Sequence, residues 1–573
     1  MKAAVRALPL HLLSLYGAGL VDALPLQALT LPVSGSKGAV ASESSICSQI
    51  GIDLLERGGN AADAMVGTML CVGTIGMYHS GLGGGGFTLV RDADGNYEAI
   101  DFREMAPAAA YEDMYHDDYL SSLVGGLAVA VPGELRGLEY LHRKYGALPW
   151  RAVVHPAVHV ARNGFNVTED LVRYMTATLE EQKKAGRGNF LLEDPAWAED
   201  FAPNGTLVTL GDVITRKRYA DTLEKIGRDG IDTFYEGEIA KSIVEAVQAT
   251  GGAITLDDMK NYTIHPKKAI HITYRGHKLY STGAPSSGPV MLSMLKTMEQ
   301  YDPLETSDVN LTTHRFIEAM RFAYAARFDL GDPDFVSDAV PLEHDMLSEQ
   351  MAQRTRSRIN DNATLPVDAY DPKAIYTPDS HGTSHIVTAD SSGLTVSTTT
   401  TINMLFGSQV MTPDTGIILN NEMNDFSVPG VRNGFGFEPS EANYIRARKR
   451  PMSSITPIVA EHANGTVLFV TGAAGGSRII SSTTQVAWRM LELGEDVVAA
   501  LAAPRFHDQL MPNEVTIEWM FDNSTVDGIQ AKGHNVTWVR PGISAVQGIR
   551  KLWDGTFEAA GEPRQRNSGG FSI

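Results

Sequence analysis

The sequence predicts an α+β protein in which β-sheets are covered by helices. Two observations lead to this fold class: strand-like segments occur in both halves of the chain, and the section between them is mainly helical. The 573 residues are 43% hydrophobic and 20% charged, which is enough apolar material for a large core. No internal repeat or long linker divides the chain, so we expect one large interwoven unit or two to four domains.

The first half begins with a predicted helical pair. Residues 39–58 and 61–70 carry apolar side chains at a spacing near 3.6, with glycines between the two segments. Alternating patterns over 87–90 and 97–102, around a turn-rich segment, predict a β-hairpin. Amphipathic spacing predicts helical structure over 134–146, 150–163, 167–184 and 216–249, strand structure over 269–283, and helices over 288–301 and 312–328.

The second half is richer in predicted strands. The segment 357–382 is the most loop-like stretch of the chain, and β-branched patterns begin directly after it. Strands are predicted over 383–390, 393–401, 455–461 and 466–471, a helix over 478–494, and further strands over 514–519 and 535–540.

The composition and the motifs exclude several classes of function. The net charge is −20 at pH 7, whereas nucleic-acid binding needs clusters of Lys and Arg. The run from Gly81 to Gly86 matches the glycine spacing of a dinucleotide-binding loop, but a hairpin follows it in place of the required helix. Two cysteines are too few for a structural zinc site. We therefore expect no nucleic-acid partner, no metal and no organic cofactor.

Residues 1–23 have the features of a secretory signal. A basic start at Lys2 and Arg6 precedes an apolar run over 8–20, and 21–23 offers small residues at the usual cleavage spacing. The apolar run is short for a bilayer span, which needs about 20 residues; a retained signal anchor is the alternative. We expect a protein that is secreted, vacuolar or held at a membrane by an uncleaved signal.

Eight Asn-X-Ser/Thr sequons also favour the secretory route, because they are acceptors for surface N-glycosylation. They lie at Asn166, Asn204, Asn261, Asn310, Asn362, Asn464, Asn523 and Asn535. The only cysteines, Cys47 and Cys71, either form one disulfide in an oxidising compartment or remain buried thiols.

The junction between Gly382 and Thr383 stands at the head of a predicted strand. Taken alone, it is a turn before a strand. Cleavage there would make Thr383 an N-terminus whose α-amine, with an ordinary pKa of roughly 7.7–8.0, can take the proton of its own hydroxyl. The threonine-rich run 395–401 either forms a ladder on an exposed face or directs Thr401 and Asn403 toward Thr383.

Other segments carry groups that suit a small zwitterionic ligand, although each also has a simple structural interpretation. The planar guanidinium of Arg103 suits a carboxylate, or forms a surface ion pair. Glu422 and Asp425, three residues apart, suit an ammonium group, or form a solvated acidic loop. The adjacent hydroxyls at 453–454 can hydrogen-bond an anion. The glycine turn at 472–476 either presents amides that form an oxyanion hole or is a simple connection.

Taken in order, these segments resemble the γ-glutamyltranspeptidase family, also called glutathione hydrolases, of the N-terminal-nucleophile hydrolase fold. Each motif is weak alone, and the ordered set is highly specific. The matching segments are Ser80 to Phe87, Asp101 to Pro107, Val131 to Gly137, Leu330 to Val336, Gly382 to His385, Asn420 to Ser427, Lys449 to Ser454 and Gly472 to Ser477. The resemblance implies a four-layer αββα sandwich in which two subunits are interwoven in one domain.

The resemblance further implies a self-processed enzyme. Cleavage between Gly382 and Thr383 gives a large subunit, 24–382, and a small subunit, 383–573, which together form a heterodimer. The Thr383 hydroxyl then attacks the γ-glutamyl amide of glutathione and related compounds. The resulting γ-glutamyl-enzyme is released to water or to an amino acid or dipeptide acceptor.

The resemblance also implies a role for each candidate residue. Thr401 hydrogen-bonds and tunes the nucleophile, and the amides of Gly475 and Gly476 stabilise the oxyanion. Two further groups hold the two ends of the glutamyl head: the α-carboxylate is held by Arg103, Ser453 and Ser454, and the α-amino group by Asn403, Glu422 and Asp425. Cys47 and Cys71 match a disulfide of the animal members.

The chain departs from the family pattern at Ser384, Asn424 and Leu405. Leu405 stands where some animal members have an aromatic residue, so the resemblance does not determine how an acceptor reaches the site. Two alternatives stand beside the leading hypothesis: an amidase of shifted specificity, such as a cephalosporin-acylase-like enzyme, and an unprocessed homologue that only binds glutamyl peptides. The complete set of carboxylate- and ammonium-binding residues argues against the first, and the intact threonine pair argues against the second.

Overall fold

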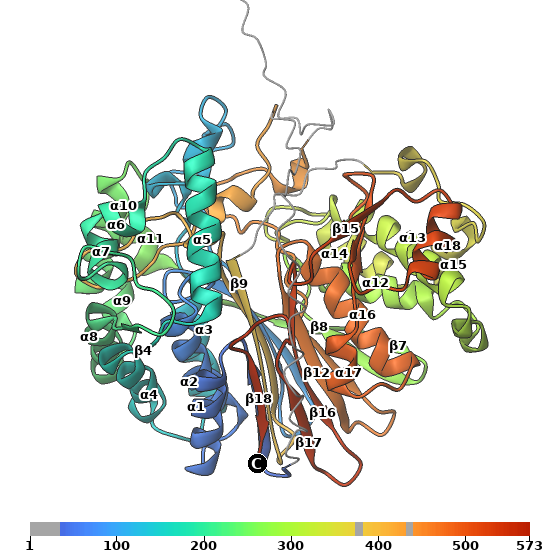
Figure 1. Ribbon diagram of the computed structural model, residues 1–573, viewed down its shortest axis with the longest axis horizontal. Coiled ribbons are helices and arrows are strands. Elements are labelled where there is room, and N and C mark those ends of the chain that lie inside the picture. Colours follow the sequence, from blue (N-terminus) through green and yellow to red (C-terminus); the bar gives the residue numbers. More distant parts are fainter. Residues whose placement is uncertain (1–34, 373–381, 431–438) are drawn as a thin grey trace, which may run out of the picture.

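Two β-sheets packed face to face form the centre of the protein, and helices cover the outer face of each sheet (Figure 1). The computed structural model describes residues 35–372, 382–430 and 439–573; the predicted signal at 1–23 lies outside these ranges. Every pair of neighbouring strands in the two large sheets is antiparallel. The predicted α+β class and the four-layer αββα arrangement are both confirmed.

The seven-stranded sheet contains the predicted hairpin and the strand that follows the Gly382–Thr383 bond. Its order is β18-β1-β9-β10-β2-β3-β6. The strands are β18 (Gly569–Ser572), β1 (Gly38–Ser42), β9 (Gly382–Asp390), β10 (Thr395–Asn403), β2 (Gly85–Arg91), β3 (Tyr97–Phe102) and β6 (His265–Lys268). The central strands β1, β9 and β10 are buried along their whole length, so both faces of this sheet are covered.

The six-stranded sheet takes its strands from residues 270–281 and 458–560. Its order is β17-β16-β12-β11-β8-β7. The strands are β17 (Phe557–Ala560), β16 (Ala545–Lys551), β12 (Val467–Ala474), β11 (Ile458–Glu461), β8 (His277–Ser281) and β7 (Ile270–Tyr274). A smaller sheet of β13 (Phe506–His507), β14 (Val515–Glu518) and β15 (Val536–Val539) lies beyond it.

Helices from the two halves of the chain cover opposite sides of the sandwich (Figure 1). The seven-stranded sheet is covered by α1 (Ser45–Glu56), α2 (Ala61–Ile75), α3 (Glu134–Tyr145), α4 (Trp150–Asn163), α5 (Glu169–Lys184), α8 (Lys217–Asp229), α9 (Asp232–Tyr235) and α10 (Glu238–Ala249). The six-stranded sheet is covered by α12 (Gly288–Met298), α13 (Val309–Arg327), α14 (Ala339–Met346), α15 (Glu349–Arg358), α16 (Arg478–Glu492), α17 (Val497–Ala502) and α18 (Asn523–Ala531).

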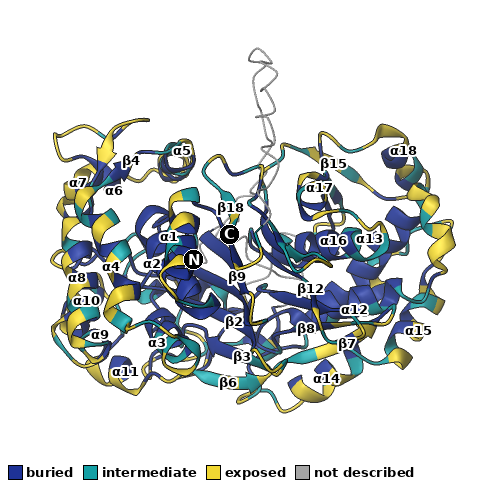
Figure 2. Cartoon of the chain, turned by 90° about the horizontal axis from the view of Figure 1, so that it is seen from below, coloured by how far each residue is buried: buried dark blue, intermediate teal, exposed yellow. Residues whose placement is uncertain are grey.

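Three apolar cores correspond to the three interfaces between the four layers. One lies on each helical side, and a smaller one between the sheets includes Val387, Ala389, Val459 and Val470. Figure 2 shows the strands at the centre as buried, with exposed residues on the outer helices. The disulfide expected from the resemblance is present: Cys47 in α1 and Cys71 in α2 are bonded, with their Cα atoms 5.3 Å apart.

Some of the predicted elements require correction. Residues 39–42 were predicted as helix, but they form β1, because a strand buried on both faces shows a continuous apolar run that resembles a helical segment. The region 216–249 is divided into α8, α9 and α10, and Gly230 lies in the left-handed region at φ +85° where α8 ends. The segment 269–283 is a hairpin of β7 and β8 rather than one strand. Within the described ranges, no helix combines the length and apolar character needed to cross a bilayer.

Candidate active site

Thr383 and Thr401 lie side by side near the ends of two central strands. Thr383 is the second residue of β9, and the register of β9 and β10 pairs it directly with Thr401. Since alternate side chains share a face, Thr383 faces the same way as Val387, which lies in the core between the sheets. Both threonines are only 3% exposed, and the Thr383 hydroxyl donates to the Thr401 hydroxyl at 3.3 Å. The threonine run is therefore a buried array rather than an exposed ladder.

The Thr401 hydroxyl also contacts the peptide bond that precedes Thr383. Its Oγ1 donates to the carbonyl oxygen of Gly382 at 2.5 Å, and it accepts from the backbone N–H of Asn403 at 2.8 Å. A hydrogen-bond donor on a carbonyl oxygen withdraws electrons from the carbonyl carbon and stabilises negative charge that develops on the oxygen. In the uncut chain, the carbonyl oxygen of the Gly382–Thr383 bond therefore accepts a hydrogen bond that activates its carbon, and a hydroxyl nucleophile lies beside it.

The two threonines open onto a cavity of about 630 Å³ of empty space, which includes solvent at its mouth. Eight of the ten site residues predicted from the sequence line the cavity: Arg103, Thr383, Thr401, Glu422, Asp425, Ser453, Ser454 and Gly476. The other two, Asn403 and Gly475, are adjacent in space or in sequence to lining residues but do not line it.

Arg103 is the centre of a buried ion cluster in this cavity. Its guanidinium donates to Glu422 and to Asp425, and Glu104 lies 3.6 Å away. The backbone carbonyl of Pro451 accepts from Nε at 3.3 Å. Arg103 is 1% exposed, so neither the surface ion pair nor the solvated acidic loop describes this region. The residues expected to bind the two ends of a zwitterion are paired with one another here.

Burial changes the protonation of the carboxyl groups in this cluster. Burial raises the pKa of Glu104 to about 7, although the positive charge of Arg103 opposes the shift. Burial also raises the pKa of Glu422, with Glu104 and Asp425 adding to the shift. Three carboxyl groups around one guanidinium cannot all carry a charge at low cost, since each desolvated anion needs a compensating cation. The cluster therefore gains a proton as the pH falls toward and below neutrality.

The glycine turn and Asn403 adopt backbone conformations that the sequence pattern does not specify. Gly475 and Gly476 have φ of +128° and +60°, a region that favours glycine. A Cβ atom on Gly475 would lie 2.7 Å from the carbonyl oxygen of Ile543. Neither glycine amide donates a backbone hydrogen bond to another described residue. Asn403 follows a register shift after Thr401, and its side-chain amide donates to the carbonyl of Asn421 at 2.9 Å.

Among the lining residues that the sequence-based prediction does not include, one is charged. Arg327, the last residue of α13, lines the cavity and is 8% exposed. It donates to the hydroxyl of Ser454 at 3.1 Å. The sequence predicts the helix that carries it, but no motif marks the residue, because its orientation toward Ser454 depends on the packing of α13 against a segment more than 120 residues away.

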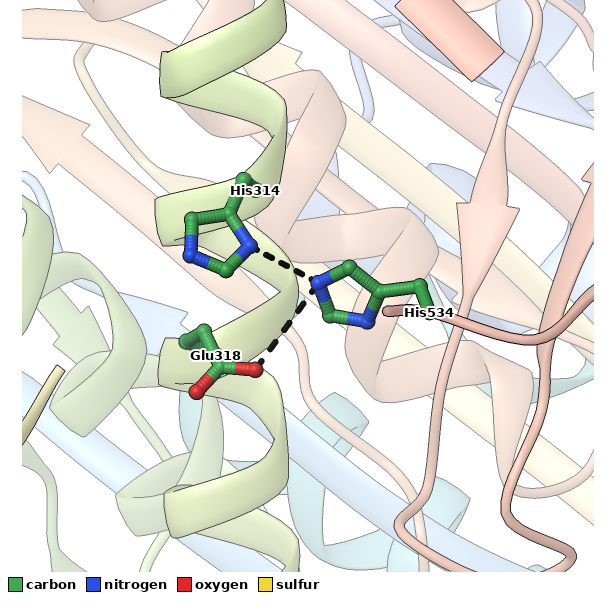
Figure 3. Close-up of side chains that lie close together, drawn as sticks. All are labelled: His314, Glu318 and His534. Carbon is green, nitrogen blue, oxygen red and sulfur yellow. Dashed lines mark hydrogen bonds and ion pairs between the residues drawn. The ribbon is translucent and has the colours of Figure 1, made fainter. Parts of the chain in front are cut away.

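A second buried cluster lies outside the cavity lining. Figure 3 shows His314 and Glu318 of α13 beside His534. Three such groups suit a divalent metal, but His314 Nδ1 and His534 Nε2 are already 2.8 Å apart, whereas two nitrogens on a tetrahedral zinc ion would be about 3.3 Å apart. His314 Nε2 lies 2.8 Å from the carbonyl of Asn360, which fixes it as the donor and leaves Nδ1 to accept from His534. We interpret the cluster as a hydrogen-bonded packing element.

The chain is similar to several known proteins. A family model described as Gamma-glutamyltranspeptidase matches residues 47–571. The chain is 50% identical over 585 residues to a protein from Arthroderma benhamiae named glutathione hydrolase proenzyme, with 98% of each chain covered. It is 48% identical to a glutathione hydrolase from Aspergillus flavus, over 93% of this chain and 89% of the relative. A solved cephalosporin acylase from Bacillus halodurans is 25% identical and gives a TM-score of 0.82, over 97% of this chain and 99% of that chain.

Proposed function

Because this chain belongs to the γ-glutamyltranspeptidase family, we propose that it is a glutathione hydrolase that cleaves γ-glutamyl amides through a γ-glutamyl-enzyme and also transfers the γ-glutamyl group. The observation that carries the proposal is the buried Thr383–Thr401 pair at the wall of a cavity that also holds Arg103 and Asp425. A nucleophile and binding groups for both ends of an amino acid are thus within one small space.

We propose that maturation begins at the Gly382–Thr383 bond. The Thr383 hydroxyl adds to the Gly382 carbonyl carbon, and the Thr401 hydroxyl stabilises the resulting oxyanion, as their contacts support. Collapse of this adduct breaks the C–N bond, transfers a proton to the amine and leaves an ester on Thr383. Water then hydrolyses the ester, which releases the Gly382 carboxylate. The products are a large subunit that ends at Gly382 and a small subunit, 383–573.

After cleavage, the free amine of Thr383 is available as the base for its own hydroxyl. The hydroxyl attacks the γ-carbonyl of the substrate, and the proton passes by way of the amine to the leaving amide nitrogen. The amides of Gly475 and Gly476, which have no other backbone acceptor among the described residues, are suited to hold the oxyanion. Water or an acceptor amine then attacks the ester and releases glutamate or a new γ-glutamyl compound.

The charged groups of the cavity support recognition of the glutamyl head. Arg103, Ser453 and Ser454 provide donors for the α-carboxylate, while Glu422 and Asp425 accept from the α-ammonium group. Because Arg103 pairs with both Glu422 and Asp425, substrate binding would exchange these internal ion pairs for contacts with the zwitterion. Asn403 would have to leave its bond to Asn421 to join the ammonium site, so its role is an expectation from the resemblance alone.

We further propose that the protein matures in the secretory pathway. The signal-like segment 1–23, the Cys47–Cys71 disulfide and the sequons support this route. Seven sequon asparagines are exposed and Asn310 is half-buried. Amino acids and dipeptides are the acceptors that we propose for the transfer reaction, since the cavity mouth is open to solvent.

Hydrolysis of two matched anilides tests the function and the amidase alternative together. We expect γ-glutamyl 4-nitroanilide to be cleaved and glutaryl 4-nitroanilide, which lacks only the α-amino group, to be cleaved at least about 100-fold less efficiently, because Glu422 and Asp425 would then lack the cation they bind. Release of glutamate from glutathione confirms the natural bond. Equal cleavage of the two anilides would support the amidase alternative, and no cleavage of either would contradict the proposed function.

A further inference from the structure

The cavity contains a second arginine, Arg327, whose side chain is held by hydroxyl groups. Arg327 donates through Nε to Ser287 Oγ at 3.1 Å and through a terminal nitrogen to Ser454 Oγ at 3.1 Å. No carboxylate of the described residues forms an ion pair with it. Arg103, in contrast, is surrounded by Glu104, Glu422 and Asp425. Arg327 is therefore the cavity cation whose charge is least compensated by the protein itself.

The direction of each hydrogen bond can be assigned because arginine only donates. Ser454 Oγ accepts from Arg327, so the Ser454 hydroxyl proton remains available for another acceptor. Ser453 Oγ accepts from the N–H of Ile455 at 3.2 Å, which leaves its proton available in the same way. Two neighbouring hydroxyls that each keep a free proton favour a ligand group that only accepts, as an ionised carboxylate does.

The same arginine also supports the backbone of this segment. Ser287, at the start of α12, accepts from Arg327 and donates to the carbonyl oxygen of Ser453 at 2.6 Å. The N–H of Ser453 in turn donates to the carbonyl of Pro285 at 2.8 Å. The segment 453–454 is thus held between α12 and the end of α13, and Arg327 contacts both Ser287 and Ser454.

We propose that Arg327 is a positioning residue for recognition of the substrate α-carboxylate: it orients the Ser454 hydroxyl as a donor and supplies the positive charge that the carboxylate meets. This inference rests on the proposed γ-glutamyl chemistry. The charge of Arg103 is already balanced by acidic neighbours. Arg327 would therefore contribute part of the affinity for the α-carboxylate.

Competitive inhibition by two ligands separates this role from a structural one. L-Glutamate and its α-amide differ in whether the group facing Ser453 and Ser454 is a carboxylate or a neutral amide. In the wild-type enzyme we expect glutamate to inhibit more strongly than the α-amide. In Arg327→Met the ratio of the inhibition constants of the α-amide and glutamate should fall by about ten- to hundredfold, because a hydrogen bond to a charged group is lost. KM for γ-glutamyl 4-nitroanilide should rise while kcat changes little.

A double-mutant comparison tests whether Arg327 acts through Ser454. We expect Arg327→Met to raise KM by a smaller factor in a Ser454→Ala background than in the wild-type background, because the hydroxyl that it orients is already absent. Self-cleavage into two fragments reports correct folding of each variant, and Arg327→Gln replaces Arg327→Met if the latter does not cleave. Equal weakening of glutamate and its α-amide, or an unchanged KM, would overturn the inference. A wild-type enzyme that does not turn over the anilide would instead contradict the proposed function.

Discussion

Two buried clusters of charged and polar side chains in this protein look alike in composition but differ in their surroundings. One surrounds Arg103 and lines the cavity; the other joins His314, Glu318 and His534 (Figure 3). Burial raises the pKa of carboxyl groups in both clusters, Glu104 in the first and Glu318 in the second. Buried titratable groups are therefore not sufficient to mark an active site.

The difference lies in what the hydrogen-bonding groups face. Glu318 accepts from the hydroxyls of Thr364 and Tyr370, and His314 is held between Asn360 and His534, so this cluster is largely closed by the protein. The Arg103 cluster borders open space and lies beside a nucleophile. We conclude that an adjacent cavity with a reactive hydroxyl distinguishes the site from the packing element.

The largest effect is expected when the central cation of the open cluster is removed. Arg103→Met should lower kcat/KM by about 100-fold or more, because charge-assisted hydrogen bonds to the substrate are lost. It should also lower the free energy of unfolding by about 3–5 kcal/mol, since Glu422 and Asp425 are left without their cation. Steady-state kinetics and denaturant unfolding measure the two effects.

Arg321→Met is the matched control. Arg321 is 1% exposed and donates to Asp508 at 2.7 Å, next to the closed cluster and outside the cavity lining. Its loss should destabilise the fold by a similar amount, about 3–5 kcal/mol, but change kcat/KM of the cleaved enzyme by less than about threefold. If the two variants lose equal activity, the distinction between the clusters fails.

An intermediate effect is expected from protonation of Glu104. Because the pKa of Glu104 is raised to about 7, this carboxyl group becomes protonated as the pH falls below that value. Protonation removes negative charge that the substrate ammonium needs, so KM should rise on acidification, by up to about tenfold per pH unit. Glu104→Gln should flatten the KM profile between pH 6 and 8. Glu98→Gln, which alters a surface pair with Lys144, should keep the wild-type profile.

The smallest effect on activity is expected in the closed cluster. His534→Ala should lower the free energy of unfolding by about 1–3 kcal/mol, because His314 loses a buried hydrogen-bond donor, and leave kcat/KM within about twofold. Burial lowers the pKa of His534 to about 3, so below its ordinary value of 6.5 the unfolded chain binds a proton that the folded chain does not. The free energy of unfolding of the wild type therefore falls as the pH drops below 6.5, and that of His534→Ala should fall less over the same range. A large loss of kcat/KM would give this cluster a catalytic role.

The sequence predicts most local elements but not how they meet. Periodicity identifies the β2–β3 hairpin and the helices around 288–301 and 312–328, because these signals are local. It fails for β1, since a strand buried on both faces lacks alternation. The direct pairing of Thr383 with Thr401 depends on strand register, which the alternating pattern suggests but does not fix.

The site residues were identified from motifs, whereas their interactions required the structure. Arg103 lies more than 300 residues from Glu422 and Asp425, so their mutual ion pairs could not be read from spacing. Glu104 lies inside a matching motif, yet its burial, and therefore its raised pKa, depends on tertiary packing. Arg327 has no motif at all, and only its contact with Ser454 brings it to the site.

The N-terminal residue of the smaller fragment tests the central claim most directly. We expect the purified protein to contain a fragment of 191 residues, 383–573, that begins with Thr383, and Thr383→Ala to remain one uncut, inactive chain. Thr383→Ser, which keeps the hydroxyl, should still cleave. A fragment that begins at another residue, or cleavage of Thr383→Ala at the same bond, would contradict the use of one hydroxyl for both maturation and catalysis.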